Sequence, residues 1–429
     1  MTPRELLIES FRAALTAADP LLIVPGHLPP PPKGRTIVVG AGKAGASMAR
    51  AVEDHWSADQ PLEGLVITRY AHGYDDRNAS ARISVVEAGH PVPDAAGEAA
   101  AKDILALVRS AGPDDLVLAL ISGGGSSLMA LPAEDITMAE LRAVTQALLA
   151  SGAPIQDMNV VRKHLSAVQG GQLAAATQAR VHALIISDVT GDDPASIASG
   201  PTAPDPSTFQ DALDVLNHYR ITPSIAVARR LSNGARGAIA ETLKPGDRIF
   251  DRVENRVIAT AHKSLCMAAA FFQQHGVTPM ILGDSVTGEA REVAKVYAAL
   301  AKQIHQHHHP LKPPVALISG GECTVTLREA GVGRGGRCSE FLLSLGIELD
   351  GLAGVQALAC DTDGIDGSEE NAGAYLATDA LYRANLGELD ARKHLANNDA
   401  FGFFAALDDL IVTGPTRTNV NDYRVILIA

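Results

Sequence analysis

Short runs of apolar residues alternate along this chain with longer segments in which apolar residues recur at helical spacing. The clearest run is residues 116–121, LVLALI, whose six consecutive apolar residues are typical of a parallel strand covered on both faces. Strands are also predicted at residues 36–39, 65–68, 83–87, 183–187, 257–260, 279–282, 315–318, 324–327, 355–359, 410–413 and 423–428. Helices are predicted at residues 2–18, 44–55, 95–110, 138–150, 261–274, 289–304 and 341–349, and in the segment that runs to about Leu243.

This alternation predicts α/β sheets with parallel cores in both halves of the chain. At 429 residues the chain exceeds one ordinary core, so we expect two domains. The turn Lys244-Pro245-Gly246-Asp247 is the expected end of the first domain, and the histidine-rich segment at residues 305–314 offers an alternative boundary near 310. Ligands of such sheets bind at the carboxyl ends of the strands.

Three predicted strands run directly into glycine-rich turns, and the string ALISGG leads into two of them. Glycines let the backbone approach a ligand, and the N–H groups of such turns suit an anion, most often phosphate. A tight strand-to-helix turn without a ligand is the alternative. The candidate phosphate-binding residues in the three turns are Gly40, Gly42, Gly45, Ser122, Gly123, Gly124, Gly125, Ser126, Ser127, Gly320 and Glu322.

The net charge of −13 disfavours nucleic acid and anionic membranes as partners, although a local pocket can still be basic. The four cysteines show no CxxC spacing and are expected to be free thiols of a cytosolic protein. The N-terminal segment is a charged amphipathic helix and not a signal peptide, and no apolar run reaches the length of a membrane span. We therefore expect a cytoplasmic protein.

The turn GAGKAG at residues 40–45 matches G-x-G-x-x-G, which alone is weak support for a dinucleotide site. The acidic residue that would bind a ribose is missing at the end of the next strand, where Arg69 stands instead. Lys43 inside the turn suits a transferring phosphoryl group better than a nicotinamide cofactor. No Walker A string is present, so the chain is not a P-loop kinase.

Two acidic loops follow predicted strands. The first contains Asp188, Asp192 and Asp193, and the second begins with Asp361 and Asp363. Carboxylates at strand ends suit Mg²⁺, which keeps several waters and takes few protein oxygens. Turn formation is the alternative, because Asp and Gly favour turns. Asp188, Asp192, Asp361 and Asp363 are the candidate metal ligands.

Two further polar segments lie in the last hundred residues. Arg334 and Arg337 stand among glycines just before a predicted helix, where they invite an anion. The loop TGPTRTNVND at residues 413–422 carries more hydrogen-bonding side chains than a connection between strands requires.

Taken together, these strings resemble the class II glycerate 2-kinases, whose C-terminal part is often called the MOFRL domain. The resemblance covers nearly the whole chain, and it rests on GAGKA, GHPVPDAAG, SGGGSSL, RKHLSAVQGG, SDVTGDDP, ASGPT, SGGE, GRGGR, DTDGIDG and TGPTRTNVND in this order. It implies a Rossmann-like three-layer N-terminal domain over residues 1–245 and a smaller MOFRL-type α/β domain with a mixed sheet over residues 246–429, around an interdomain cleft. It also implies transfer of the γ-phosphoryl group of ATP to the 2-hydroxyl of D-glycerate, with Mg²⁺.

The family's proposed catalytic lysine and arginine fall on Lys43 and Arg337, and both are expected to be replaceable by Met without loss of folding. Asp188 is our candidate base for the 2-hydroxyl. The candidate contacts to the substrate are Arg162 or Lys163 for the carboxylate, together with His72. Cys338-Ser339 departs from the pair that the family commonly shows after GGR.

Some members of the family are labelled hydroxypyruvate reductase, so an NAD(P)H-dependent reductase is the alternative function. The GAGKAG turn and Arg69 support it only weakly, because no hydride-transfer acid such as a His–Glu pair is evident. The sequence does not set the oligomeric state, and a homodimer is one assembly that we consider.

Overall fold

The computed structural model describes residues 1–74, 81–327 and 333–429. These residues form two compact units, of which one is Pro20–Ile258 and the other joins Met1–Asp19 to Ala259–Ala429. We call Pro20–Ile258 the continuous unit, because it is one stretch of the chain, and the other the mixed-sheet unit, after its sheet described below. No helix in the described part of the chain is both long enough and apolar enough to cross a membrane.

The continuous unit is built on a six-stranded sheet in the order β3-β2-β1-β4-β5-β6. Its strands are β1 (Thr36–Ala41), β2 (Leu62–Arg69), β3 (Ile83–Ala88), β4 (Leu116–Ile121), β5 (Arg180–Ile186) and β6 (Val253–Ala259). The pairs β1–β2, β2–β3, β1–β4 and β4–β5 are parallel, as the apolar runs predicted. The strand order reverses between β1 and β4, where open α/β sheets bind their ligands.

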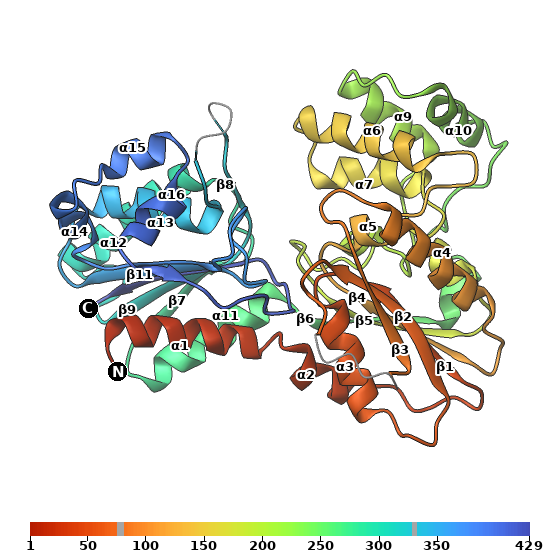
Figure 1. Ribbon diagram of the computed structural model, residues 1–429, viewed down its shortest axis with the longest axis horizontal. Helices are drawn as coiled ribbons and strands as arrows, with labels where there is room; N and C mark the ends of the chain where they lie inside the picture. The colour runs from red at the N-terminus through yellow and green to blue at the C-terminus, as the bar shows by residue number, and fades with distance from the viewer. Residues whose placement is uncertain (75–80, 328–332) are drawn as a thin grey trace. The chain divides into compact units, whose positions relative to one another are not determined.

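Helices cover both faces of this sheet (Figure 1). The helices of the unit are α2 (Pro20–Ile23), α3 (Gly45–His55), α4 (Ala95–Arg109), α5 (Gly125–Leu128), α6 (Met138–Ala150), α7 (Ile155–His164), α8 (Gln172–Ala175), α9 (Phe209–His218) and α10 (Ile225–Ala235), with 3-10 turns at Val24–His27, Ile197–Ser199 and Arg248–Arg252. α4 packs against Ile37 and Val39 of β1. α6, α7, α9 and α10 form a separate helical cluster around Phe209 and Leu216.

The mixed-sheet unit contains a six-stranded sheet in the order β13-β12-β11-β14-β9-β7 and a short pair, β8 with β10. Its strands are β7 (Thr278–Gly283), β8 (Gly288–Glu289), β9 (Val315–Ser319), β10 (Cys323–Thr324), β11 (Val355–Asp361), β12 (Gly373–Leu376), β13 (Leu410–Ile411) and β14 (Asp422–Ile428). Its helices are α1 (Pro3–Thr16), α11 (Ala261–Gln274), α12 (Ala290–His307), α13 (Arg337–Leu349), α14 (Ala380–Leu386), α15 (Ala391–Ala396) and α16 (Ala400–Ala406). α1 and α11 lie on one face of the sheet, and α12, α13 and α16 on the other (Figure 1).

The second sheet corrects the expectation of a parallel core in this half of the chain. Only β7 and β9 pair in parallel, whereas the pairs β9–β14, β14–β11, β11–β12 and β12–β13 are antiparallel. The segment between β11 and β12 holds no helix, so it cannot make the crossover that a parallel pair requires. The mixed sheet implied by the family resemblance is confirmed.

The division of the chain also differs in detail from the expected boundary at residue 245. β6 completes the first sheet, so the continuous unit runs on to Ile258. The amphipathic helix α1 buries Leu7 and Phe11 against Leu265 and Phe272 of α11, so the first residues of the chain belong to the mixed-sheet unit. Sequence order alone could not show that pairing.

Candidate active site

The turn after β4 offers backbone donors that no described residue uses. Ser122 donates its N–H to the carbonyl of Ala41 (3.1 Å), and Gly125 donates to the carbonyl of Ser122 (3.2 Å). The N–H groups of Gly123, Gly124 and Ser126 make no hydrogen bond within the described part of the chain. Gly124 has a φ of 82°, which a residue with a side chain rarely adopts. This turn therefore has the form of an anion cradle.

The neighbouring turn after β1 is different, because its N–H groups are satisfied by the protein. Gly42 donates to the carbonyl of Ile67 (3.1 Å), Lys43 to the carbonyl of Gly123 (2.8 Å), and Gly45 to the carbonyl of Gly42 (2.9 Å). A Cβ atom on Gly42 would lie 2.0 Å from the Oγ atom of Ser122. The glycines of this turn thus have a packing explanation, and the turn shapes the site without cradling a ligand.

Two side chains border the β4 turn. A Cβ atom on Gly124 would lie 2.9 Å from Cδ2 of His90 and 3.5 Å from Cγ of Lys43. Lys43 thereby stands beside the open N–H groups of the β4 turn. His90 was not among the predicted site residues. Its position directly after β3, at the same edge of the sheet, was the signal that could have identified it.

A pocket opens beside the same turn, with an empty volume of about 370 Å³. Its walls are Pro91, Pro93, Ser126, Ser127, Ala130, Leu141, Arg142, Thr145, Arg162, Ser166 and Gln169. The serines are held in place, since Gln169 donates to the carbonyl of Ser126 (2.9 Å) and the hydroxyls of Ser126 and Ser199 are 2.8 Å apart. Arg142 was also missed, because an arginine in an amphipathic helix carries no signal of its own.

The structure separates the two candidate cations for the substrate carboxylate. Arg162 faces the pocket, and its side chain makes no hydrogen bond or ion pair with any described residue. Burial lowers the pKa of its guanidinium. Lys163 points elsewhere and forms a buried ion pair with Asp205, at 3.3 Å between Nζ and Oδ1. Burial acts to raise the pKa of Asp205, but Lys163 and hydrogen bonds from Ser207 and Thr242 lower it overall.

Lys163→Met should therefore reduce the free energy of unfolding by about 3–5 kcal/mol, because it leaves Asp205 buried and uncompensated. Arg162→Met removes no ion pair and should cost less than about 1 kcal/mol. Urea titrations of the two variants at neutral pH compare these values directly. The difference between the two losses of unfolding free energy should become smaller in acid. Because the folded protein lowers the pKa of Asp205, the ion pair stabilises the fold at neutral pH, and this stabilisation is lost as Asp205 becomes protonated. Equal losses at neutral pH would contradict the assignment.

The other predicted site residues in this unit, His72, Asp188 and Asp192, differ in burial and in hydrogen bonding. His72 is fully buried, with its Nδ1 atom 3.1 Å from the carbonyl oxygen of Tyr70, and that position favours a structural role. Asp188 and Asp192 are partly buried in the loop that follows β5. The side chain of Asp192 makes no hydrogen bond with any residue that the structure describes, whereas Asp193 accepts hydrogen bonds from Ala195 and Ser196.

In the mixed-sheet unit, Arg337 lies at the start of α13 and binds three carboxylates. Its Nε donates to Asp422 (2.7 Å), its Nη1 to Glu322 (2.9 Å) and its Nη2 to Asp361 (2.6 Å). Burial acts against the charged form of Arg337, but Asp422, Asp361 and Glu322 raise its pKa above the usual value. A guanidinium has five N–H donors, so the three contacts leave two for another anion.

The expected anion at the start of α13 is supplied by the protein itself. Asp366 accepts hydrogen bonds from the N–H groups of Cys338 (2.9 Å) and Ser339 (2.8 Å) and from the Ser339 hydroxyl (2.6 Å). Burial raises the pKa of Asp366, and these hydrogen bonds oppose that shift. The residues Cys338 and Ser339, which depart from the family pattern, thus help to fix the helix that carries Arg337.

The third glycine turn does not repeat the open geometry of the β4 turn. Gly320 donates its N–H to the carbonyl of Gly283 (2.8 Å), and the carbonyl of Gly321 accepts from the N–H of Asp422 (3.2 Å). Glu322 is paired with Arg337. The shared string ALISGG therefore has different surroundings in the two sheets, because the N–H of its first glycine is bonded to the carbonyl of Gly283 in the second copy, whereas that of Gly123 in the first copy makes no hydrogen bond with a described residue.

The candidate metal ligands are divided between the two units. Asp188 and Asp192 belong to one unit, and Asp361 and Asp363 to the other. Asp361 is engaged by Arg337 and by the N–H of Asp363, and Asp363 accepts from the N–H of Ile365. Across residues 1–74, 81–327 and 333–429, no group of three or more His, Cys, Asp or Glu side chains is arranged to hold a metal ion.

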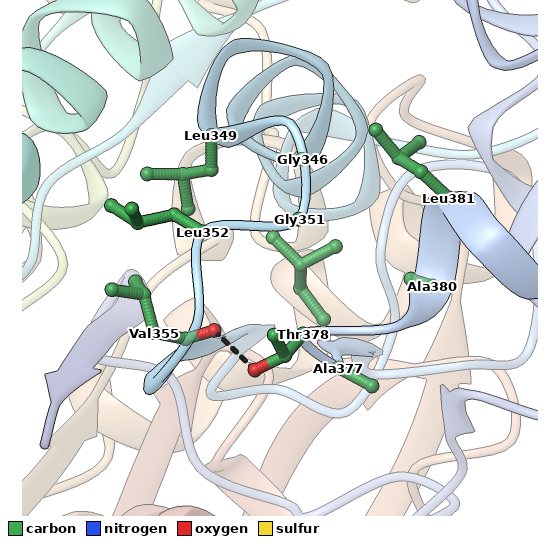
Figure 2. Close-up of a pocket in the computed structure, with 10 residues that line it drawn as sticks. Gly346, Leu349, Gly351, Leu352, Val355, Ala377, Thr378, Ala380 and Leu381 are labelled. Carbon is green, nitrogen blue, oxygen red and sulfur yellow. Dashed lines mark hydrogen bonds between the residues drawn. The ribbon is translucent and has the colours of Figure 1, made fainter.

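A second hollow, in the mixed-sheet unit, lacks the chemistry of an active site. It lies at the end of α13, and its walls are Gly346, Leu349, Gly351, Leu352, Val355, Leu376, Ala377, Thr378, Ala380 and Leu381 (Figure 2). Its one side-chain hydroxyl, on Thr378, donates to the carbonyl of Val355 at 2.9 Å. No charged side chain lines it, so we place the candidate active site at the β4 turn and the pocket with Arg162.

Known proteins match this chain over nearly its whole length. A family model described as a domain of unknown function (DUF4147) matches residues 6–232, and the MOFRL family model matches residues 315–422. An Agrobacterium vitis protein with the provisional name hydroxypyruvate reductase is 48% identical, and the match covers 100% of this chain and 95% of that protein. The glycerate 2-kinase of Pyrococcus horikoshii is 37% identical, with 98% of this chain and 94% of that protein covered.

A solved structure agrees with these matches. The crystal structure of glycerate kinase from Thermotoga maritima is similar to this chain with a TM-score of 0.87 and 37% sequence identity, over 99% of both chains. The fold and the order of the motifs are thus shared from end to end. The chain belongs to the glycerate 2-kinase family, in which a DUF4147 region is followed by a MOFRL region.

Proposed function

We propose that this chain is a glycerate 2-kinase, which transfers the γ-phosphoryl group of ATP to the 2-hydroxyl of D-glycerate and yields 2-phosphoglycerate and ADP. The observation that carries the proposal is the end-to-end match with glycerate kinases in sequence and in structure. The site geometry supports it, because unused backbone donors, a lysine and a pocket with an uncompensated arginine lie around one turn.

The catalytic work of such an enzyme is mainly positioning and electrostatic stabilisation. The N–H groups of Gly123, Gly124 and Ser126 would bind phosphate oxygens, and Lys43 would neutralise the negative charge of the transferred group. Arg337 is held in a fixed orientation by Asp361 and Asp422, so its charge is preorganised for the same task. Asp188 remains our proposed base for the 2-hydroxyl.

Magnesium is part of this proposal, and Asp188 and Asp192 are the residues that would hold it. Asp192 fits because its carboxylate has no hydrogen-bond partner among the described residues, whereas Asp361 and Asp363 are already engaged. Mg²⁺ takes few protein oxygens and shares its remaining positions with water and phosphate. When bound, it would neutralise charge on the phosphate oxygens of the nucleotide.

Activity should accordingly depend on Mg²⁺ as well as on ATP. Excess EDTA should reduce turnover of D-glycerate to background, and added Mg²⁺ should restore it, because free ATP leaves the phosphate charge uncompensated. Asp192→Asn should raise the Mg²⁺ concentration needed for half-maximal activity. Undiminished turnover in EDTA would remove the metal from the mechanism.

A second candidate function, reduction of hydroxypyruvate with NAD(P)H, is favoured by the provisional name of the Agrobacterium vitis relative. Two features of the site weigh against it. β2 ends in Arg69 rather than an acidic residue that would bind a ribose. The N–H groups of the β1 turn, which would face the pyrophosphate of a dinucleotide, are bonded to the protein.

The free thiols Cys266, Cys323, Cys338 and Cys360 agree with the reducing cytoplasm, which we propose as the location. Phosphorus NMR of the reaction products tests the proposed function. D-glycerate and ATP should give a 2-phosphoglycerate signal with an equal amount of ADP. A 3-phosphoglycerate signal as the main species, or no phosphorylated acid, would reject the assignment.

A further inference from the structure

Two arginines from different helices line the pocket beside the β4 turn. Arg142 comes from α6 and Arg162 from α7. Neither side chain makes a hydrogen bond or an ion pair with any residue in the described part of the chain, and the Nε atom of Arg142 is buried without a partner. Arginines that are removed from water are normally paired, because leaving such donors unsatisfied is costly.

Among the described residues, no acidic side chain forms an ion pair with either arginine. Asp94 is the acidic group that interacts electrostatically with Arg142, but its two oxygens accept hydrogen bonds from the N–H of Gly97 (2.9 Å) and the hydroxyl of Tyr70 (2.7 Å). Burial lowers the pKa of Arg162, and no acidic group offsets this. Asp94 therefore offsets part of the charge of Arg142 without pairing with it, whereas Arg162 has no acidic neighbour in the part of the chain that the structure describes. The pocket keeps a net positive charge in a chain whose net charge is −13. Such a pocket calls for an anionic ligand.

The pocket's shape and walls indicate which anion. The pocket is small, so it suits a small acid rather than a whole nucleotide. Pro91, Pro93 and Leu141 form apolar walls, and Ser126 and Ser127 provide hydroxyls on the side of the phosphate cradle. Two planar guanidinium groups match the planar oxygens of a carboxylate.

We propose that Arg142 and Arg162 together bind the carboxylate of the acceptor and so make the enzyme selective for 2-hydroxy acids over neutral polyols. This inference rests on the proposed function and deepens it. Charge-assisted hydrogen bonds to a buried carboxylate stabilise the bound acid and contribute nothing to a neutral acceptor. The carboxylate-binding arginines then hold the acid with its 2-hydroxyl toward Lys43 and the β4 turn.

The test uses the full-length chain with R142Q and R162Q, the conservative variants R142K and R162K, and R229Q as a control. Arg229 is an exposed arginine on α10, outside the pocket. We measure KM for D-glycerate and for ATP, and the dissociation constant of D-glycerate by calorimetry. In R142Q and R162Q the glycerate KM and dissociation constant should each rise at least about tenfold, while the KM for ATP stays within about twofold.

In R142K and R162K, the KM and the dissociation constant for D-glycerate should lie between those of the glutamine variants and wild type, because lysine keeps the charge but cannot donate two parallel hydrogen bonds. R229Q should match wild type in both constants. An unchanged dissociation constant for D-glycerate in R142Q, or a rise in the KM for ATP instead, would overturn the proposal. If wild type binds D-glycerate without phosphorylating it, the proposed function fails, but loss of that binding in R142Q would still support the two-arginine site. No D-glycerate binding by wild type would overturn it.

Discussion

Replacing Lys43 by Met should lower kcat for D-glycerate phosphorylation at least about a hundredfold and change KM much less. The reason is that Lys43 borders the β4 turn, where in the proposed mechanism it would stabilise the charge distribution that develops as the phosphoryl group is transferred. Steady-state kinetics on both substrates measures this effect, and circular dichroism checks that the variant is folded. A reductase that used this turn for NADP would instead lose cofactor affinity and keep most of its kcat.

Lys33→Met is the matched control, because Lys33 is an exposed lysine of the same unit that precedes β1. It should retain wild-type kinetics. A kcat for Lys43→Met within about threefold of wild type would remove Lys43 from the mechanism, since a transition-state contact cannot be lost at so small a cost.

Replacing Arg337 by Met should have two large effects. The kcat should again fall at least about a hundredfold if Arg337 acts on the phosphoryl group as proposed, because that positive charge is lost. The variant should also be destabilised by about 3 kcal/mol or more, because Asp361 and Asp422 are buried and lose a cationic partner. This prediction differs from the expectation from sequence that Arg337→Met folds normally, because the structure places three carboxylates around Arg337.

Arg337→Lys separates the two effects. A lysine can still neutralise one carboxylate, but it cannot donate to three carboxylates at fixed angles as a guanidinium does. Compared with Arg337→Met, Arg337→Lys should therefore regain more stability than kcat. Urea unfolding and kinetics on the same preparations make the comparison. Wild-type kcat in either Arg337 variant, once folding is confirmed, would leave Arg337 with a structural role only.

The parts of the fold that follow from local patterns were predictable from the sequence. The apolar runs identified β1, β4 and β5, and helical spacing identified α1, α4 and α6, because burial on both faces of a strand or on one face of a helix leaves a direct trace in the residues. The antiparallel strand β12 was missed. It is short, and its pairing with β11 and β13 depends on how the loops return rather than on its own composition.

The candidate site shows the same limit at the level of single residues. The glycine turns after β1 and β4 look equally suited to phosphate in sequence, and only the tertiary hydrogen bonds show that one is satisfied by the protein. Arg162 and Lys163 are adjacent, yet one helical step turns the first toward the pocket and the second into an ion pair with Asp205. Partners distant in sequence decide these roles.

The central claim is that this chain phosphorylates D-glycerate. Its most direct test is a coupled assay of ADP release with D-glycerate, ATP and Mg²⁺, run beside an assay of NADH and NADPH oxidation with hydroxypyruvate on the same preparation. We predict ADP release that requires D-glycerate, with no oxidation of either nicotinamide cofactor above background. Oxidation that requires hydroxypyruvate, without ADP release that requires D-glycerate, would contradict the claim.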